Sequence, residues 1–374
     1  MFGKRSIHSN LSLKDKIFSL DMTLVLLVLL LGIISFFAMY STDGGQFAYH
    51  TKSHIVRFVV FFILFISASF LQSNFWYNSS TFIYLGILAL LVLVKYFGLT
   101  SSGSQRWLSL YFINLQPSEL MKIGLILFLA KYYHRISSGD VNRLKFLLYP
   151  LIALVAPVIL VVTQPDLGTG FLIAAGGAVV VWLAGVKMKF FAYLSVVFLS
   201  IAPVAISFLK PYQKSRILNF IDPSRDPLGA GYQITQSKIA IGSGGLFGKG
   251  FLNGSQSYLD YLPEKHTDFI FTLFSEEFGF FGSCLVLGIY TLITWKIVLI
   301  GNMVRETFGK LYCYSFATAF FIYVAVNMGM VLGLIPIVGA PLPILSYGGS
   351  SMMAIMLGLG IVMSFKIHKD QPIG

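Results

Sequence analysis

Apolar stretches of about 20 residues, the length that crosses a bilayer, recur along almost the whole chain and constrain its fold more than any other feature. A helix of that length satisfies its own backbone hydrogen bonds within the hydrocarbon core. A membrane β-barrel would instead show short segments of alternating polarity. Because 56% of the residues are hydrophobic and only 11% are charged, the chain is too apolar for a soluble globular protein. We therefore predict an all-α polytopic membrane protein.

The hydropathy pattern predicts ten transmembrane helices in a single integral membrane domain, residues 1–374. The ten spans are expected at 21–40, 55–72, 80–98, 115–133, 146–164, 167–186, 190–209, 269–299, 311–335 and 346–366. The first apolar run is too long for a cleaved signal peptide, so we interpret it as a membrane anchor. One large loop, 210–268, is predicted between spans seven and eight, with short segments, 1–20 and 367–374, at the two termini.

The distribution of lysine and arginine predicts the orientation of these helices. Basic residues gather after the even-numbered spans, such as Arg135 and Arg143 after the fourth, and the positive-inside rule places these connections in the cytoplasm. Both termini are therefore predicted to be cytoplasmic, with the loop 210–268 outside the cell. Most of the 15 carboxylates fall on or near the outer side, which favours a functional site there.

Charge and cysteine usage exclude two other classes of protein. The formal net charge of +12 comes from residues dispersed through the loops and not from a basic domain, so we expect no nucleic-acid partner. The two cysteines, Cys284 and Cys313, both lie in apolar runs, which indicates neither a disulfide framework nor a cysteine metal site.

The densest group of ionisable residues precedes the eighth predicted span. Asp260, Glu264, Lys265, His266 and Asp268 fall within nine residues, and an apolar run begins directly after the last of them. Ionisable groups at a membrane boundary are costly to desolvate, so several together typically mark a functional site. The alternative is a solvated loop in which Asp268 caps the following helix.

A second charged group lies at the start of the fourth predicted span. Glu119 and Lys122 stand three residues apart on one helix face, just after Pro117, and Arg106 and Trp107 precede them in the outer loop. Charges at this depth are expected to be paired, hydrated or functional. The simpler interpretation is a local ion pair with Trp107 as an ordinary interface residue.

The glycine-rich stretch 242–250 contains Lys249 and superficially suggests a nucleotide site. It fails the P-loop pattern, because Ser243 stands where the first glycine is required and Gly250 replaces the final Ser or Thr. A loop whose backbone N–H groups and Lys249 bind an anion remains a hypothesis.

Several motifs in this order make the chain resemble the SEDS family (shape, elongation, division, sporulation) of bacterial cell-wall proteins, over nearly its whole length. They are Ser104-Gln-Arg-Trp, Gln116-Pro-Ser-Glu, Gln164-Pro-Asp-Leu-Gly-Thr, Asp226-Pro-Leu-Gly-Ala-Gly-Tyr, Gln236-Ser-Lys-Ile-Ala-Ile-Gly, Leu262-Pro-Glu-Lys-His-Thr-Asp and Pro341-Leu-Pro-Ile-Leu-Ser-Tyr-Gly-Gly. The resemblance implies a ten-span peptidoglycan glycosyltransferase that polymerises lipid II at the outer face of the bacterial cytoplasmic membrane, for cell elongation and rod shape. It also implies membrane lipids, a class B penicillin-binding protein and other elongation-complex membrane proteins as partners.

The resemblance also implies roles for individual residues. Asp268 matches the essential aspartate of the family, and Asp260 stands at a position that is acidic in relatives. Residues that match the lining of the family's cavity are Arg106, Trp107, Glu119 and Lys122. Glu264, which precedes the His-Thr-Asp motif, and His266, its first residue, are expected to bind substrate with them.

The chemistry of lipid II polymerisation agrees with these roles. The 4-hydroxyl of one sugar must attack the anomeric carbon of another while a diphosphate leaves, and Asp268 is expected to act as the general base. The positive charge for the diphosphate is expected from Lys122, Arg106, Lys249 or a divalent cation, Mg²⁺ or Mn²⁺, held by carboxylates, and these alternatives stay open.

Two functions from other classes also fit the sequence. A lipid II flippase would use Glu119 and Lys122 along a transport path. A non-catalytic scaffold would only activate its penicillin-binding partner, but this function leaves the carboxylates at the membrane edge unexplained.

Overall fold

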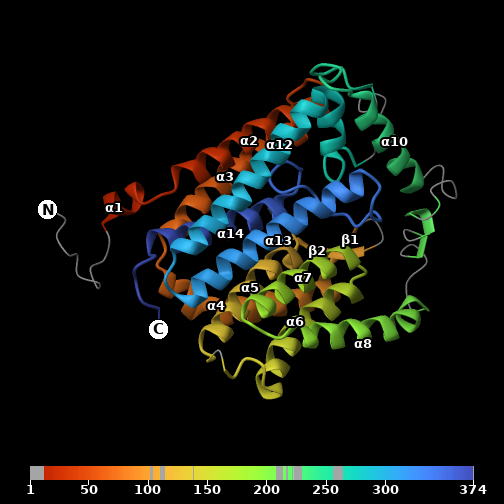
Figure 1. Cartoon of the computed structure of the whole chain (residues 1–374). Coiled ribbons are helices and arrows are strands. Elements are labelled where there is room, and N and C mark those ends of the chain that lie inside the picture. The colour runs from red at the N-terminus through yellow and green to blue at the C-terminus, as the bar shows by residue number, and fades with distance from the viewer. Residues whose placement is uncertain are drawn as a thin grey trace.

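The computed structural model describes residues 12–101, 104–109, 114–137, 139–207, 214–215, 218–220, 222, 230–255 and 264–373. Ten long helices in this part of the chain form a bundle, and each overlaps one of the ten predicted spans (Figure 1). They are α2 (Met22–Thr42), α3 (Tyr49–Phe70), α4 (Ser73–Phe97), α5 (Pro117–His134), α6 (Leu144–Thr163), α7 (Leu167–Leu183), α8 (Met188–Ser207), α12 (Ile270–Met303), α13 (Thr307–Val331) and α14 (Gly349–Ile367). The all-α fold class is confirmed.

Seven of these helices, within the described residues, are long and apolar enough to cross a membrane. The other three are α5, which carries the charged side chains of Glu119, Lys122 and Lys131, and the apolar α7 and α8, of which α7 is shorter. Large apolar side chains are exposed on the outside of the bundle, as expected where lipid replaces water. The chain is a multi-pass membrane protein.

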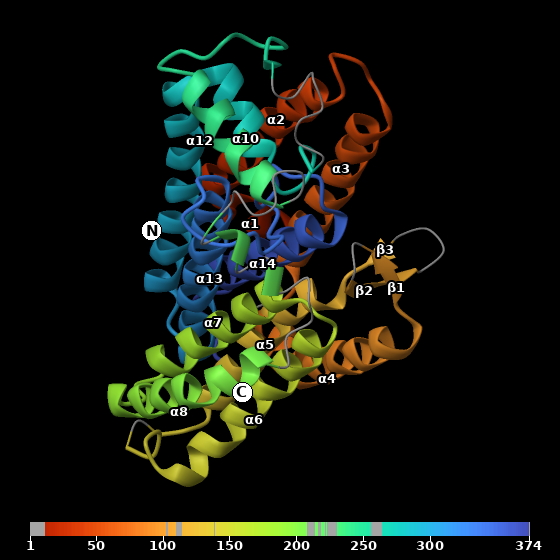
Figure 2. The same cartoon turned by 90° about the vertical axis from the view of Figure 1, so that its right-hand side faces the viewer.

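Short elements lie at the two ends of the bundle. Helix α1 (Leu13–Phe18) and the C-terminal end of α14 lie at one end, which we call the terminal end, whereas α10 (Ala230–Ser243) lies at the other (Figure 1). Strands β1 (Leu99–Ser101), β2 (Ser104–Ser109) and β3 (Asn114–Leu115) connect α4 to α5, as Figure 2 shows from the side. They pair antiparallel, with Leu99 opposite Trp107 and Leu108 opposite Leu115, so Trp107 lies in a small sheet that the sequence did not predict.

The eighth predicted span, 269–299, is not one straight helix. Gly279 has φ 65° and ψ −160°, a conformation that only glycine adopts without strain, and it breaks α12 near its start. The carbonyls of Glu276 and Glu277 are thereby released from the helix, and they accept the N–H groups of Lys249 (3.0 Å) and Gly250 (3.0 Å). The sequence missed this kink because the apolar pattern continues through it.

This kink also determines the role of the glycine-rich stretch 242–250. The N–H groups of Phe280 and Phe281 donate back to the carbonyls of Gly245 (2.9 Å) and Leu246 (3.2 Å), so loop and kink are joined from both sides. The backbone N–H groups of Lys249 and Gly250 are therefore used within the protein, which weakens the hypothesis that they bind an anion.

The connection between α13 and α14 packs directly on the start of α7. A Cβ at Gly168 would lie only 2.5 Å from the carbonyl oxygen of Val338, so only glycine permits this approach. Asp166 caps α7 by accepting the N–H of Thr169 at 3.1 Å. The α13–α14 connection is thus held against the start of α7. Asp166, which caps α7, also contacts Arg106.

At the terminal end, the buried Asp21 caps α2 and binds two lysines. Its Oδ2 lies 3.0 Å from Nζ of Lys296 and 3.2 Å from Nζ of Lys366. Burial opposes ionisation, but these two cations and the N–H of Leu24 outweigh it and hold the pKa of the carboxyl below its usual value. We call these three side chains the Asp21 cluster. It ties together α2, α12 and α14.

Candidate functional site

Asp268 lies in the turn that leads into α12, and a residue of α13 holds this turn in place by a hydrogen bond. The buried side-chain amide of Asn327, in α13, donates to the backbone carbonyl of Asp268 (3.1 Å) and to that of Ala340 (2.6 Å). The N-cap position of α12 is occupied by Phe269 and not by Asp268. The side chain of Asn327 therefore holds the turn that carries Asp268 next to the α13–α14 connection.

Gly339 shows which side chains face the same space as Asp268. A Cβ at this glycine would lie 3.6 Å from Oδ2 of Asp268 and 4.0 Å from Nη1 of Arg106. Its φ of 69° is in the left-handed region, so a side chain here would be strained as well as intrusive. Because Gly339 has no side chain, the space beside it is lined by both the Asp268 carboxylate and the Arg106 guanidinium.

Arg106 is oriented by Asp166, the residue that caps α7. Nη1 of Arg106 lies 3.3 Å from Oδ2 of Asp166, which also accepts the hydroxyl of Thr169 (2.9 Å) and the side-chain amide of Gln116 (3.4 Å). The Nε of Arg106 is buried and has no hydrogen-bond partner among the described residues. Asp166 thus fixes one nitrogen of the guanidinium, and the buried Nε is a second donor on the same group.

Glu119 and Lys122 form the predicted ion pair. Tyr323 of α13 contacts both of these residues, and Ser351 of α14 bonds to Tyr323. Nζ of Lys122 lies 2.8 Å from Oε2 of Glu119 and 3.9 Å from the centre of the Tyr323 ring. The Tyr323 hydroxyl donates to Oε2 of Glu119 (3.3 Å) and shares a hydrogen bond with the Ser351 hydroxyl (3.0 Å). This tyrosine therefore links the ion pair of α5 to Ser351 of α14.

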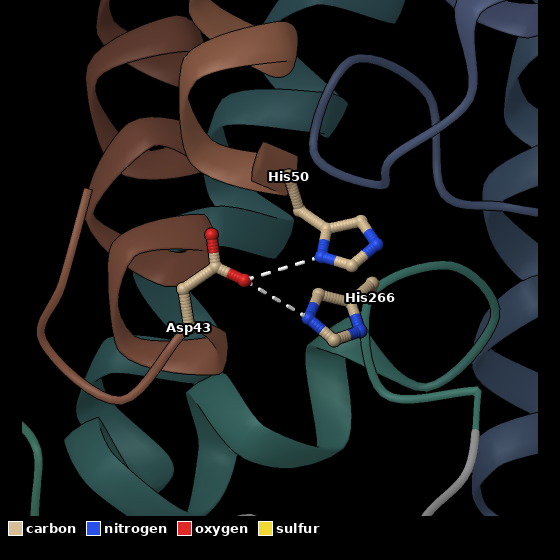
Figure 3. A group of neighbouring side chains, drawn as sticks. All are labelled: Asp43, His50 and His266. Carbon is tan, nitrogen blue, oxygen red and sulfur yellow. Dashed lines mark hydrogen bonds and ion pairs between the residues drawn. The ribbon is translucent and has the colours of Figure 1, made fainter. Parts of the chain in front are cut away.

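His266 faces away from this group and toward the connection between α2 and α3. Its Nε2 lies 3.3 Å from Oδ1 of Asp43, and its ring lies 4.1 Å from that of His50, centroid to centroid (Figure 3). Burial and the neighbouring His50 lower the pKa of His266. Burial opposes ionisation of Asp43, but hydrogen bonds from Thr51 and the proximity of His266 outweigh it and keep its pKa below the usual value.

The remaining predicted residues lie elsewhere. Nζ of Lys249 lies 2.6 Å from Oε1 of Glu276, which also accepts the hydroxyl of Ser255. Glu264 is exposed and accepts the hydroxyl of Thr267 at 2.9 Å. Asp260 lies outside the described residues.

Arg106 and Asp268 thus lie beside Gly339, and Glu119 and Lys122 lie beside Tyr323; we call these four residues the site group. Sequence reasoning missed Tyr323, Ser351 and Asn327, because each is a single polar residue in or beside an apolar run. Their burial, at 6% exposure or less, is the signal that sequence does not carry. The arrangement offers a carboxylate, a partly unpaired guanidinium and a buried ion pair, which suits proton transfer beside an anionic leaving group.

Comparison with known proteins gives consistent matches. Residues 18–371 match the FtsW/RodA/SpoVE family, described as cell cycle protein. The chain is 39% identical to the peptidoglycan glycosyltransferase MrdB of Escherichia coli (strain K12), over 95% of both chains. It is 33% identical to stage V sporulation protein E of Bacillus subtilis (strain 168), over 92% of this chain and 96% of that one.

Solved structures agree in fold. One is a chain from a peptidoglycan synthase complex that coordinates polymerization and crosslinking, with a TM-score of 0.80 and 32% identity over 94% of this chain and 99% of that one. Another is the crystal structure of the rod shape determining protein RodA of Thermus thermophilus, with a TM-score of 0.71 and 27% identity over 94% of this chain and 98% of that one.

Proposed function

The chain belongs to the FtsW/RodA/SpoVE family of cell cycle proteins, and from this membership we propose that it polymerises lipid II into glycan strands. Its enzyme class is that of its relatives, and the protein is a peptidoglycan glycosyltransferase. The substrate, the orientation in the membrane, the partner and the roles of single residues are the proposal. The observation that carries it is the convergence of Asp268 and Arg106 on the space at Gly339.

In the proposed reaction, Asp268 is the general base. It takes the proton from the 4-hydroxyl of the acceptor sugar as that oxygen attacks the anomeric carbon of the donor. The bond from the anomeric carbon to the diphosphate breaks in the same displacement, so the donor's α linkage becomes β and no covalent enzyme intermediate forms. A positioned general base contributes roughly 10²–10⁴-fold to the rate of such a step.

Arg106 is our choice among the cations for the leaving diphosphate. Lys122 is engaged by Glu119 and Tyr323, and Lys249 is engaged by Glu276 and Ser255. Arg106 shares one nitrogen with Asp166 and keeps a buried Nε without a partner among the described residues. A guanidinium can present two parallel N–H groups to a phosphate, which favours Arg106 for this role.

The proposal places the protein in the bacterial inner membrane, with both termini in the cytoplasm and the site group on the outer side. The positive-inside pattern supports this orientation. The location of α1 and the end of α14 at the same end of the bundle supports placing both termini on one side of the membrane (Figure 1). A class B penicillin-binding protein is the proposed partner, which the similarity to a chain of a peptidoglycan synthase complex supports. Cell elongation is the proposed process, given the similarity to RodA.

The test is a gel assay of glycan chains made from purified protein and lipid II. The protein is assayed with and without its penicillin-binding partner, whose own transpeptidase is blocked. We expect wild type to form polymer and Asp268→Asn to form at least about 10²-fold less, because an amide cannot accept the proton. The matched control is Asp140→Asn, a carboxylate at the terminal end that pairs with Arg143, and it should polymerise like wild type.

Normal polymerisation by Asp268→Asn would contradict its role as base. If neither wild type nor mutant forms polymer while both are folded and bound to the partner, the proposed reaction fails. A vesicle assay of lipid II translocation would then test the flippase.

A further inference from the structure

Three potential metal ligands from distant parts of the chain meet at one point. Asp43 follows the last residue of α2, His50 is the second residue of α3, and His266 lies in the turn before α12 (Figure 3). One ligand atom from each lies within 4.8 Å of the other two, and this is the group of three His, Cys, Asp or Glu residues with such spacing in the described part of the chain. We call these three side chains the His-His-Asp cluster.

Two nitrogen–oxygen distances in this cluster match the spacing of ligands around a shared metal ion. Nδ1 of His50 and Nε2 of His266 each lie 3.3 Å from the same Oδ1 of Asp43. An ordinary N–H···O hydrogen bond has its heavy atoms about 2.9–3.0 Å apart. Ligands about 2.0–2.1 Å from a tetrahedral ion are about 3.3–3.4 Å apart, as the geometry of a tetrahedron requires.

The carboxylate is oriented by a residue outside the cluster. Thr51 donates its backbone N–H (2.8 Å) and its hydroxyl (2.6 Å) to Oδ2 of Asp43, which turns Oδ1 toward the two rings. Such outer hydrogen bonds are typical of metal sites, where they fix the direction of a ligand. The side chain of Asp43 is only 3% exposed, whereas those of His50 and His266 are 40% and 19% exposed, so an ion can enter from the histidine side.

The ligand types indicate which ion would bind. Mg²⁺ and Ca²⁺ prefer oxygen ligands throughout, whereas two imidazoles with one carboxylate suit Zn²⁺ and similar transition metals. Three protein ligands leave one position of a tetrahedron open to water or to an oxygen of another molecule. We propose that Asp43, His50 and His266 bind a divalent transition metal ion of the zinc class with one open coordination position.

The ion would connect the α2–α3 turn to the segment that carries Asp268. His266 is two residues before Asp268, and its carbonyl accepts the N–H of Tyr347 at 2.8 Å. The ring of His50 also packs edge-on against the ring of Tyr347, with centroids 5.2 Å apart. A bound ion would therefore hold the first outer turn, the turn before α12 and the α13–α14 connection together.

The test measures bound metal directly and does not depend on polymerisation. Full-length protein, purified in detergent through a tag without histidines and stripped with a chelator, is dialysed against buffered Zn²⁺ and analysed by mass spectrometry for metal content. We expect one Zn²⁺ per chain. We expect Thr51→Val, which keeps all three ligands, to weaken binding about 10–100-fold, and His50→Ala, which removes a ligand, to weaken it more.

The matched control is His134→Ala, which removes a histidine at the far end of α5 that lies outside the cluster. It should bind Zn²⁺ like wild type. Zn²⁺ should also raise the unfolding temperature of wild type but not that of His50→Ala, because an ion that binds only the folded state stabilises it. His50 is partly exposed, so this variant is expected to fold.

Two results would overturn the proposal. The first is wild-type protein that retains no Zn²⁺ after dialysis. The second is equal binding by wild type, His50→Ala and Asp43→Asn, which would place the metal elsewhere. Failure of the glycosyltransferase assay would leave the metal result unchanged, since the two readouts are separate.

Discussion

The Asp21 cluster and the site group both bury charge within the bundle, but they do so in different ways. Asp21 faces two lysines and a backbone N–H, so both oxygens of its carboxylate have donors. In the site group, Arg106 keeps a buried Nε without a partner among the described residues, and Lys122 shares its charge between a carboxylate and a ring. A saturated cluster stabilises helix packing, whereas incomplete pairing leaves capacity for a ligand.

The largest expected effect that sharpens this comparison is that of Arg106→Lys on activity. The charge is kept, but the planar fork that could hold two phosphate oxygens is lost, so kcat/KM should fall about 10²-fold. The unfolding temperature should change little, because Asp166 keeps its bonds from Thr169. Polymerisation kinetics and a thermal melt of the same preparation measure both.

Arg143→Lys is the matched control, because this arginine forms an exposed ion pair with Asp140 and should leave both measurements unchanged. Wild-type kinetics in Arg106→Lys would show that the fork is not needed, and Lys122 would become the next candidate for the diphosphate.

Asp21→Asn should have the opposite pattern, with a large effect on stability and little on activity. The substitution leaves the half-buried Lys296 and Lys366 near each other without their counter-charge, which should cost about 3 kcal/mol of unfolding free energy. Thermal unfolding in detergent measures the loss. Polymerisation per folded molecule should stay at the wild-type level at low temperature. A stable variant with reduced polymerisation would remove the contrast between the two clusters.

Tyr323→Phe is expected to have the smallest effect of the three substitutions. It should lower both activity and stability slightly. It removes the hydroxyl that bonds to Glu119 and Ser351 but keeps the ring under Lys122, so roughly one buried hydrogen bond, about 1–2 kcal/mol, is lost. We expect a fall in kcat of up to about tenfold, with KM less affected.

Tyr314→Phe is the matched control for this change, because Tyr314 also lies in α13 and its hydroxyl donates to Asn302 of α12. It should not alter kcat. If both variants behave alike, Tyr323 contributes to packing and not to the site group.

The helices were predictable because each depends on a local property of the chain. An apolar run long enough to cross a bilayer becomes a helix wherever it packs, and ten runs overlap ten helices. The capping role of Asp166 and the Glu119–Lys122 pair were also predictable, since both partners lie within three residues. The kink at Gly279 was not, because it requires the loop 242–250 to supply N–H groups to the freed carbonyls.

The sequence by itself determined the helical membrane fold, the family and the motif that contains Asp268. Only the tertiary structure decided which side chains meet there. Tyr323 bonds to Glu119 across 204 residues, and His266 reaches Asp43 across 223. Hydropathy and motif spacing describe neighbours along the chain, but these contacts depend on how helices pack against one another, and any of several packings satisfies the same apolar pattern.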